Sequence, residues 1–217
     1  MTADLFENIG DTGPSEETMA DGAVLLRGFA RTVEAELLAA LHAIEAQAPF
    51  RHMRTPGGHE MSVAMTNCGA FGWTTDRGGY CYRPDDPQSG RPWPAMPSAF
   101  HALATQAAAR AGFAGFLPDA CLINRYVPGA RMSLHQDRDE KDFENPIVSV
   151  SLGLPAIFLF GGLKRTDGPT RYRLEHSDVV VWGGPSRLFF HGVAPLADGE
   201  HGLLGRRRIN LTFRRAC

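Results

Sequence analysis

The sequence of 217 residues lacks the cysteine patterns that build a disulfide framework or a zinc site. Its 4 cysteines are scattered, and no two of them have the Cys-x-x-Cys spacing. Scattered cysteines are typical of reduced thiols in a reducing compartment. The chain also lacks an apolar run of the roughly 18 residues that a membrane helix needs, and its start lacks the basic and apolar regions of a signal peptide. These absences predict a cytoplasmic protein that does not span a membrane.

Lysine and arginine are absent from residues 1–21, which contain six acidic residues. The remainder therefore holds all 22 basic residues against 18 of the 24 acidic ones and is mildly basic. A mildly basic surface is compatible with a polyanionic partner, although an ordinary solvated surface explains it equally well. We expect residues 1–22 to form an acidic, flexible segment. Residues 23–217 show no repeat or linker, and we expect them to form a single domain.

The first half of this domain contains two predicted helices on either side of an unusual segment. After a short strand at 23–26, helices are expected at 32–48 and 98–111, because apolar residues recur there with helical period. The segment 50–95 is instead rich in Gly and Pro, and its Met and aromatic residues alternate with arginines. This composition suits a surface that faces a ligand. The alternative is a long irregular loop that its aromatic residues hold in place.

The second half consists of short runs of strand-forming residues separated by turn signals such as Pro128-Gly129. Many short strands in a row favour a double-sheet jelly roll over a parallel α/β sheet. The expected fold class is therefore mainly β with N-terminal helices (α+β). Eight strands are predicted, at 121–127, 132–137, 146–152, 156–160, 171–175, 178–182, 187–191 and 207–214.

A candidate metal site begins with His135 and Asp137, which lie two positions apart. On a strand their side chains point to the same face, roughly 7 Å apart at the backbone. His191, at the expected end of a later strand, is the candidate third ligand. Two histidines and one carboxylate form the facial triad of non-haem Fe(II) oxygenases. The alternatives are a chance His-x-Asp pair and a histidine that simply packs in the core.

The last predicted strand has a polar face, because Arg208, Asn210 and Arg214 alternate with apolar residues. Guanidinium groups suit the binding of carboxylates. The two arginines are about 20 Å apart along the strand, so they would serve opposite ends of a small dicarboxylate. Asn124 and Tyr126 similarly share a face on the strand before the His-x-Asp pair. The alternative for the arginines is surface charge at a chain end.

These residues resemble the AlkB family of nucleic-acid demethylases, and in particular its bacterial branch. The resemblance covers residues 23–217. The sequence departs from the family pattern at 199–207 and at Ile209, and these departures concern substrate preference rather than the catalytic core. The matching runs are Met-Ser-Val-Ala-Met-Thr-Asn-Cys-Gly (61–69), Gly-Trp-Thr-Thr (72–75), Trp-Pro-Ala-Met-Pro (93–97), Ser-Val-Ser-Leu-Gly-Leu-Pro-Ala-Ile-Phe (149–158) and Val-Val-Val-Trp-Gly-Gly (179–184).

The resemblance implies a double-stranded β-helix, a cupin-like jelly roll, with a nucleotide-recognition lid above the metal. It implies Fe(II), 2-oxoglutarate as co-substrate, and O2. The implied reaction hydroxylates an N-methyl group of 1-methyladenine or 3-methylcytosine, which leaves as formaldehyde, while 2-oxoglutarate becomes succinate and CO2. The implied iron ligands are His135, Asp137 and His191, and the implied 2-oxoglutarate contacts are Asn124, Tyr126, Arg208, Asn210 and Arg214.

The resemblance also assigns the 50–95 segment to the lid. A base must leave its stack to reach a buried metal, and Trp73 would stack on the flipped base opposite the ring of His135. Asp139 would accept a hydrogen bond from the exocyclic amine and offset the positive charge of the lesion. The implied substrate contacts are Trp73, Tyr80, Tyr82, Asp139, Arg165, Thr55 and Met65.

The expected partner is alkylated DNA, single-stranded in preference, with RNA as a further substrate, and the protein is expected to act as a monomer without contact to a membrane. Two other functions fit parts of the pattern. The first is a 2-oxoglutarate-dependent hydroxylase of a small molecule or a protein side chain. The second is a cupin-like binding module without catalysis.

Overall fold

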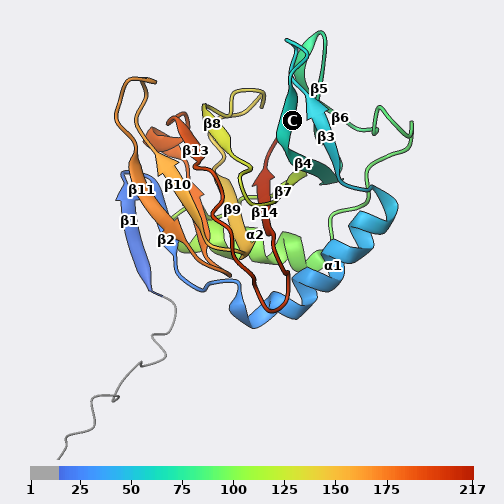
Figure 1. The fold of residues 1–217 in the computed structure, drawn as a ribbon. Helices are drawn as coiled ribbons and strands as arrows, with labels where there is room; N and C mark the ends of the chain where they lie inside the picture. Colours follow the sequence, from blue (N-terminus) through green and yellow to red (C-terminus); the bar gives the residue numbers. More distant parts are fainter. Residues whose placement is uncertain (1–14) are drawn as a thin grey trace, which may run out of the picture.

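The computed structural model describes residues 15–217, in which a large β-sheet faces a smaller one and two helices lie against the outer side of the larger sheet (Figure 1). The larger sheet has eight strands in the order β1-β2-β12-β9-β14-β7-β4-β3. Their bounds are β1 Glu16–Ala20, β2 Ala23–Leu26, β3 Arg51–Arg54, β4 Glu60–Gly69, β7 Ala120–Tyr126, β9 Ile147–Gly153, β12 Val179–Trp182 and β14 Arg208–Arg214.

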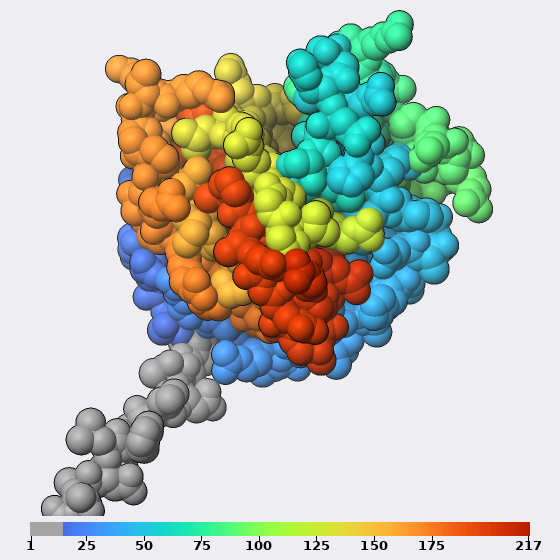
Figure 2. Space-filling model, in the orientation of Figure 1, coloured from blue at the N-terminus to red at the C-terminus, as the bar shows by residue number. Residues whose placement is uncertain are grey.

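The smaller sheet has four strands in the order β11-β10-β13-β8, and a separate hairpin, β5–β6, stands beside the two sheets. In the space-filling view, the yellow-green segment around β8 lies between the orange β10–β11 region and the teal β3–β4 region (Figure 2). The bounds are β5 Gly72–Asp76, β6 Gly79–Arg83, β8 Met132–His135, β10 Ala156–Phe160, β11 Thr170–Leu174 and β13 His191–Val193.

The helices cover the outer face of the larger sheet because each presents an apolar stripe of helical period. Leu37 and Ile44 of α1 and Phe100 of α2 are buried against alternate residues of the sheet, including Phe213 of β14. The rings of Phe100 and Phe213 meet edge to face at 5.8 Å. The helical bounds are α1 Glu34–Gln47 and α2 Ser98–Arg110, with short 3-10 helices η1 Arg31–Val33 and η2 Gly184–Ser186.

A second core fills the space between the two sheets. Tyr126, Phe158, Phe160 and Trp182 contribute its large side chains. Strands of the larger sheet therefore bury side chains on both faces, and the polar face of β14 points into this second, inner space. The predicted fold class and both predicted helices are confirmed.

The prediction of a flexible segment through residue 22 is wrong for its last part. Residues 16–20 form β1, which pairs antiparallel with β2. Glu17 on this strand accepts a hydrogen bond from Arg27 at 2.7 Å, and Arg27 also bonds the buried Asp178. The acidic side chain is thus part of a small ion-pair network rather than a loose tail. Residues 1–14 of the predicted segment lie outside the described part of the chain.

The 50–95 segment contains four strands, β3 to β6, which its Gly-rich and polar composition did not predict. Glycine is required at one of the joints: a Cβ on Gly72 would lie 2.4 Å from the indole of Trp93. The longest part outside these strands is the proline-containing stretch 84–97. The alternative of a long loop is therefore wrong for most of the segment.

Two strand boundaries near the candidate metal site also differ from prediction. His191 begins β13 instead of ending a strand at 187–191, because η2 turns the chain and the guanidinium of Arg187 points into the protein. The strand predicted at 132–137 ends at His135. Asp137 is consequently placed by side-chain and backbone contacts and not by continued strand alternation.

Candidate active site

The strands bring the three predicted metal ligands together. His191 lies opposite His135 in the antiparallel pairing of β13 with β8. One ligand atom from each of His135, Asp137 and His191 lies within 4.8 Å of the other two. Gly192 makes this possible, because a Cβ there would meet the carbonyl oxygen of Met132 at 2.7 Å. A larger residue would force the two histidine-bearing strands apart.

Both imidazoles present the same nitrogen to the centre of this cluster. Nδ1 of His135 donates to the carbonyl of Ser133 at 2.9 Å, and Nδ1 of His191 donates to the carbonyl of Phe189 at 3.0 Å. This fixes the tautomer and leaves Nε2 with a lone pair. The Nε2 atoms lie 3.5 and 3.7 Å from the two carboxylate oxygens of Asp137. Two nitrogens and a carboxylate are suitable ligands for Fe(II).

The electrostatics favour the metal-binding protonation states of Asp137 and His191. Burial lowers the pKa of His191, the charge of His135 adds to this, and the result is about 4. Burial alone would raise the pKa of Asp137, but the positive charge of Arg214 keeps it well below its usual range. Burial lowers the pKa of His135, yet the neighbouring Asp137 carboxylate outweighs this and raises it. At neutral pH, Asp137 is an anion and His191 is neutral.

Arg214 lies at the end of β14 and holds Asp137 in place. Its Nε and Nη2 donate to Oδ2 of Asp137 at 3.0 and 2.6 Å. Its Nη1 is buried and has no partner among the described residues. Arg214 therefore orients the carboxylate and retains one donor for another group.

Arg208, at the other end of the same strand face, is a buried cation without a carboxylate partner among the described residues. It is 1% exposed, it donates to Oγ of Ser151 at 3.0 Å, and it lies over the ring of Tyr126 at 5.1 Å. Its Nε and Nη1 have no partner in the described part of the chain. A buried guanidinium in this state is costly. The spare donors are suitable for a carboxylate of 2-oxoglutarate, and this role of Arg208 stays a prediction.

Asn124 and Asn210 lie opposite each other on β7 and β14. Nδ2 of Asn210 donates to Ser149 at 2.7 Å and to the carbonyl of Val150 at 3.1 Å, so this side chain is fully engaged within the sheet. Its Oδ1 accepts from Asn124 at 3.4 Å. The Oδ1 end of Asn124 has no partner in the described residues. Asn210 thus supports Asn124, which keeps a free polar end.

The hairpin β5–β6 carries the aromatic residues predicted for the lid. The ring of Trp73 stacks on Tyr80 at 5.3 Å, with 15° between the planes. Its Nε1 donates to Oδ2 of Asp139 at 2.8 Å. The backbone of Trp73 is held from the sheet below, because the side-chain amide of Asn67 bonds both its N–H and its C=O at 3.0 Å. An aromatic face and a carboxylate are therefore fixed side by side.

Tyr82, another of the implied substrate contacts, directs its hydroxyl into the protein. Its hydroxyl donates to Oε1 of Glu140 at 2.7 Å. Burial raises the pKa of Tyr82 well above its usual value, and the negative charges of Glu140 and Asp137 add to this rise. The positive charge of Arg214 acts in the opposite direction. Glu140, which the sequence did not single out, lies within a network of buried charges. The only feature of the sequence that could have indicated a role for Glu140 is its position three residues after Asp137.

The remaining predicted substrate contacts lie at different depths. Met65 is fully buried in the core between the sheets and Trp73 packs against that core. Thr55 lies at the β3–β4 turn, where its hydroxyl accepts a hydrogen bond from the backbone of His59 at 3.2 Å. Arg165 is exposed on the β10–β11 turn, over the ring of Phe190 at 5.8 Å. A substrate could therefore reach Thr55 and Arg165 from the surface, whereas Met65 is enclosed by the core.

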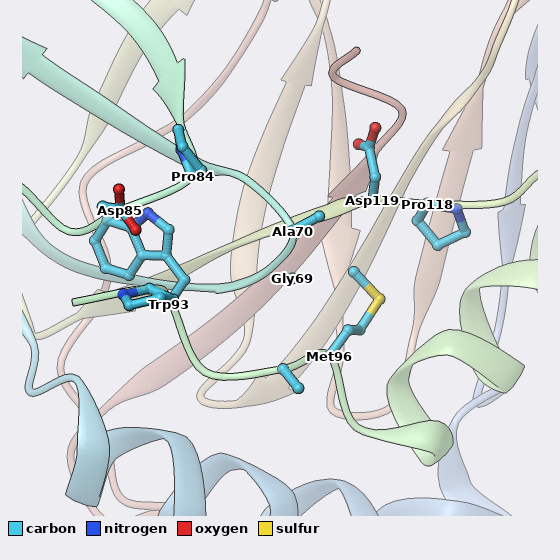
Figure 3. A pocket seen from close by; sticks show the side chains of 10 residues that line it. Gly69, Ala70, Pro84, Asp85, Trp93, Met96, Pro118 and Asp119 are labelled. Atoms are coloured by element: carbon cyan, nitrogen blue, oxygen red, sulfur yellow. The ribbon is translucent and has the colours of Figure 1, made fainter.

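A cavity of about 570 Å³ lies apart from the metal ligands, at the base of the β5–β6 hairpin. Figure 3 shows Trp93 on one side of it, Pro118 and Asp119 on the other, and Met96 below. The carboxylate of Asp119 already accepts the backbone N–H groups of Ala216 and Cys217. The cavity therefore has mainly apolar walls, and its two carboxylates are Asp85 and the engaged Asp119.

Comparison with known proteins identifies the family. The model of the "2OG-Fe(II) oxygenase superfamily" matches residues 22–214. The chain is 60% identical over 213 residues to "Alpha-ketoglutarate-dependent dioxygenase AlkB" of Escherichia coli, which covers 98% of this chain and 97% of that protein. It is 41% identical over 108 residues to "Nucleic acid dioxygenase ALKBH1" of Mus musculus, covering 48% of this chain and 28% of that protein.

A solved structure agrees with this result. "The structure of OsALKBH1" superimposes with a TM-score of 0.81 at 27% identity, covering 93% of this chain and all of that one. Within residues 15–217, no helix combines the length and apolar character needed to cross a membrane. The chain belongs to the 2OG-Fe(II) oxygenase superfamily and, within it, to the AlkB family of alpha-ketoglutarate-dependent dioxygenases.

Proposed function

We propose that this enzyme is an oxidative demethylase that repairs N-alkylated bases, such as 1-methyladenine and 3-methylcytosine, in DNA and RNA. One observation carries the proposal. The metal-ligand cluster is followed directly by Asp139, whose carboxylate holds the indole N–H of Trp73. A flipped, cationic base requires three adjacent features: a metal site for the chemistry, an aromatic face for stacking and a carboxylate to offset its charge. The similarity to "Nucleic acid dioxygenase ALKBH1" supports a nucleic-acid substrate.

As a member of the superfamily, the enzyme uses Fe(II), 2-oxoglutarate and O2. We assign His135, Asp137 and His191 as the iron ligands. Arg208 is assigned to the distal carboxylate of 2-oxoglutarate because its donors are buried and unpaired. The co-substrate site is completed by the free donor of Arg214 and the free amide end of Asn124. Tyr126 lies beside Arg208 in the same site.

Bound Fe(II) with 2-oxoglutarate supplies O2 activation coupled to decarboxylation, so that the N-methyl group is hydroxylated and lost as formaldehyde. The protein provides the geometry for this chemistry. Arg214 keeps the Asp137 carboxylate ionised and oriented. The two backbone carbonyls behind His135 and His191 fix their tautomers, which makes Nε2 the coordinating atom in both cases.

The lid provides recognition. Tyr80 covers one face of Trp73, so the other face is available to stack on a base. Asp139 is exposed and uses one oxygen for the indole N–H. The second oxygen is free to accept the exocyclic amine of adenine or cytosine, and its charge offsets the positive charge of the methylated ring.

The decisive experiment is mass spectrometry of single-stranded oligonucleotides carrying 1-methyladenine, incubated with the protein and Fe(II), with and without 2-oxoglutarate. The methyl group should be lost only in the complete mixture. Trp73→Ala and Asp139→Asn should each reduce the reaction by about tenfold or more, because one stacking contact or one charged hydrogen bond is worth 1–3 kcal/mol. Glu144→Gln, an exposed carboxylate on the same segment, is the matched control. Unchanged demethylation in both lid variants would contradict the proposal in favour of a different hydroxylation substrate.

We further propose that single-stranded nucleic acid is preferred and that the protein acts as a cytoplasmic monomer. A base in a single strand leaves its stack at lower cost than one in a duplex. Competition between matched single-stranded and double-stranded oligonucleotides measures the strand preference, and light scattering of the protein at working concentration measures its oligomeric state. Equal rates on both forms would contradict the strand preference.

A further inference from the structure

Glu140 is a buried carboxylate that the proposed reaction does not use. Its side chain is 2% exposed, although it lies only three residues beyond Asp137. Three groups compensate its charge: the hydroxyl of Tyr82 at 2.7 Å, Nη2 of Arg187 at 3.1 Å and Nε of Arg214 at 3.2 Å. These groups come from the lid, from the segment before β13 and from β14. One carboxylate therefore joins three separate parts of the site.

The same two arginines also hold the metal ligand Asp137. Arg214 donates to its carboxylate at 2.6 and 3.0 Å, and Nη1 of Arg187 donates to its backbone carbonyl at 3.0 Å. Two carboxylates and two guanidinium groups thus form a buried cluster without net charge. Loss of the charge on Glu140 would leave an excess positive charge beside a site that receives a cation.

The connection from Glu140 to the lid is equally direct. Tyr82 lies opposite Trp73 in the pairing of β6 with β5. The β5–β6 hairpin pairs only with itself, so its position depends on side-chain contacts to the rest of the protein. The bond from Tyr82 to Glu140 is one of these contacts, and it ends on the cluster that orients Asp137.

We propose that Glu140 is a positioning residue that couples the nucleotide lid to the metal ligand Asp137. On one side it fixes Tyr82, and hence the strand opposite Trp73. On the other side it fixes Arg187 and Arg214, and through them Asp137. The inference rests on the proposed function for the meaning of the lid. The inference has two halves, a metal half (the connection to Asp137) and a lid half (the connection to Tyr82), and each is tested by a binding measurement rather than by turnover. The inference can therefore fail while the proposed function holds.

The metal half is tested by Mn(II) binding to the metal-free protein, measured from the electron paramagnetic resonance of free Mn(II). Glu140→Gln should weaken binding by roughly tenfold, as loss of a partner behind a metal ligand does. Glu140→Asp should restore most of the affinity because it keeps the charge. Asp86→Asn is the matched control: Asp86 is also buried and paired with an arginine, but far along the chain in the 84–97 segment. Wild-type Mn(II) affinity in Glu140→Gln would overturn this half.

The lid half is tested by the dissociation constant for a methylated single-stranded oligonucleotide, measured by fluorescence anisotropy. Tyr82→Phe and Glu140→Met, each of which removes one partner of the bond, should each weaken binding by about fivefold, the worth of one hydrogen bond. The double variant should be no weaker than Glu140→Met alone, because both changes remove the same contact. Additive losses would overturn the coupling.

The Glu140→Asp variant separates positioning from charge and serves if Glu140→Gln does not fold. Its shorter side chain should lose the bond from Tyr82, so oligonucleotide binding should fall as in Tyr82→Phe while Mn(II) affinity is kept. Tyr82→Phe should leave Mn(II) affinity unchanged. Wild-type oligonucleotide affinity in Glu140→Asp, or loss of Mn(II) affinity in Tyr82→Phe, would contradict the proposal.

Discussion

The metal-binding core and the nucleotide lid of this enzyme are built by different means. In the core, β14, which carries Arg208 and Arg214, is paired on both sides by β7 and β9, and β13, which carries His191, is paired on both sides by β10 and β8. The lid strands β5 and β6 pair only with each other and reach the core through side chains such as Asn67 and Tyr82. Because the hairpin is held at few points, we expect substitutions there to change substrate affinity, whereas substitutions in the core should change the chemistry.

The largest effect is expected in the core, from Asp137→Ala. This change removes the carboxylate from the metal-ligand cluster and leaves the buried Arg214 without its closest partner. Formation of succinate from 2-oxoglutarate should fall to background, with and without nucleic acid. Glu45→Gln, which breaks a half-buried pair with Arg125, is the control and should keep activity. Residual succinate formation well above background would show that the cluster is not the metal site.

Arg208→Met should separate co-substrate binding from stability. Loss of one partner of a buried charge pair costs about 2–5 kcal/mol, so the KM for 2-oxoglutarate should rise by at least about thirtyfold. The protein without 2-oxoglutarate should not lose stability, because the guanidinium is buried there without a carboxylate. Thermal unfolding with and without 2-oxoglutarate measures the stability, and the rate of succinate formation measures the KM. Arg215→Met, a more exposed arginine beyond the same strand, is the control.

A fall in melting temperature of Arg208→Met, with an unchanged KM, would mean that Arg208 is structural. In that case the co-substrate would depend on Arg214 alone. The wild-type protein should also gain stability on addition of 2-oxoglutarate, by mass action on the folded state, and the Met variant should lose most of this gain.

A smaller effect is expected in the lid, from Asn67→Ala. Asn67 is fully buried and bonds both backbone groups of Trp73. Without it, Trp73 is less well placed and the KM for a methylated oligonucleotide should rise by about fivefold to tenfold, the worth of one to two hydrogen bonds. Succinate formed in the absence of nucleic acid should stay at the wild-type level.

Thr74→Val is the matched control for Asn67→Ala. Thr74 is also buried in β5, but its hydroxyl bonds the carbonyl of Cys81 within the hairpin and does not tie the hairpin to the sheet. Its KM should change by less than that of Asn67→Ala. Equal changes in the two variants would mean that general lid stability, and not the placement of Trp73, decides substrate affinity.

The same difference between core and lid explains how much could be predicted from the sequence. Strand alternation has a period of two, so the order of residues alone predicts that Arg208, Asn210 and Arg214 share one face of β14. These core positions follow from local order. His191 was a candidate ligand from its place near a predicted strand end, and the resemblance of the longer motifs favoured this role over that of a histidine packed in the core.

The lid and its supports could not be predicted in this way. Glu140 meets Tyr82 across 58 positions of the chain, and Trp73 meets Asp139 across 66. Such contacts have no local period, and strand β8 ends at His135, so alternation does not extend to Glu140. The strands of the 50–95 segment were missed because their glycines and polar residues resemble a loop.

The smallest effect is expected from charges at the rim of the lid. Arg77 is exposed at the β5–β6 turn, so it is available to a phosphate group. Each phosphate contact to a single strand contributes about −0.7 to the slope of log affinity against log salt. Few such contacts are expected, so the wild-type slope should be modest, and Arg77→Ala should reduce it by about that amount. Arg110→Ala, at the end of α2 on the helical side of the larger sheet, should leave the slope unchanged. A wild-type affinity that does not vary with salt would show that the lid recognises the base without following the phosphate backbone.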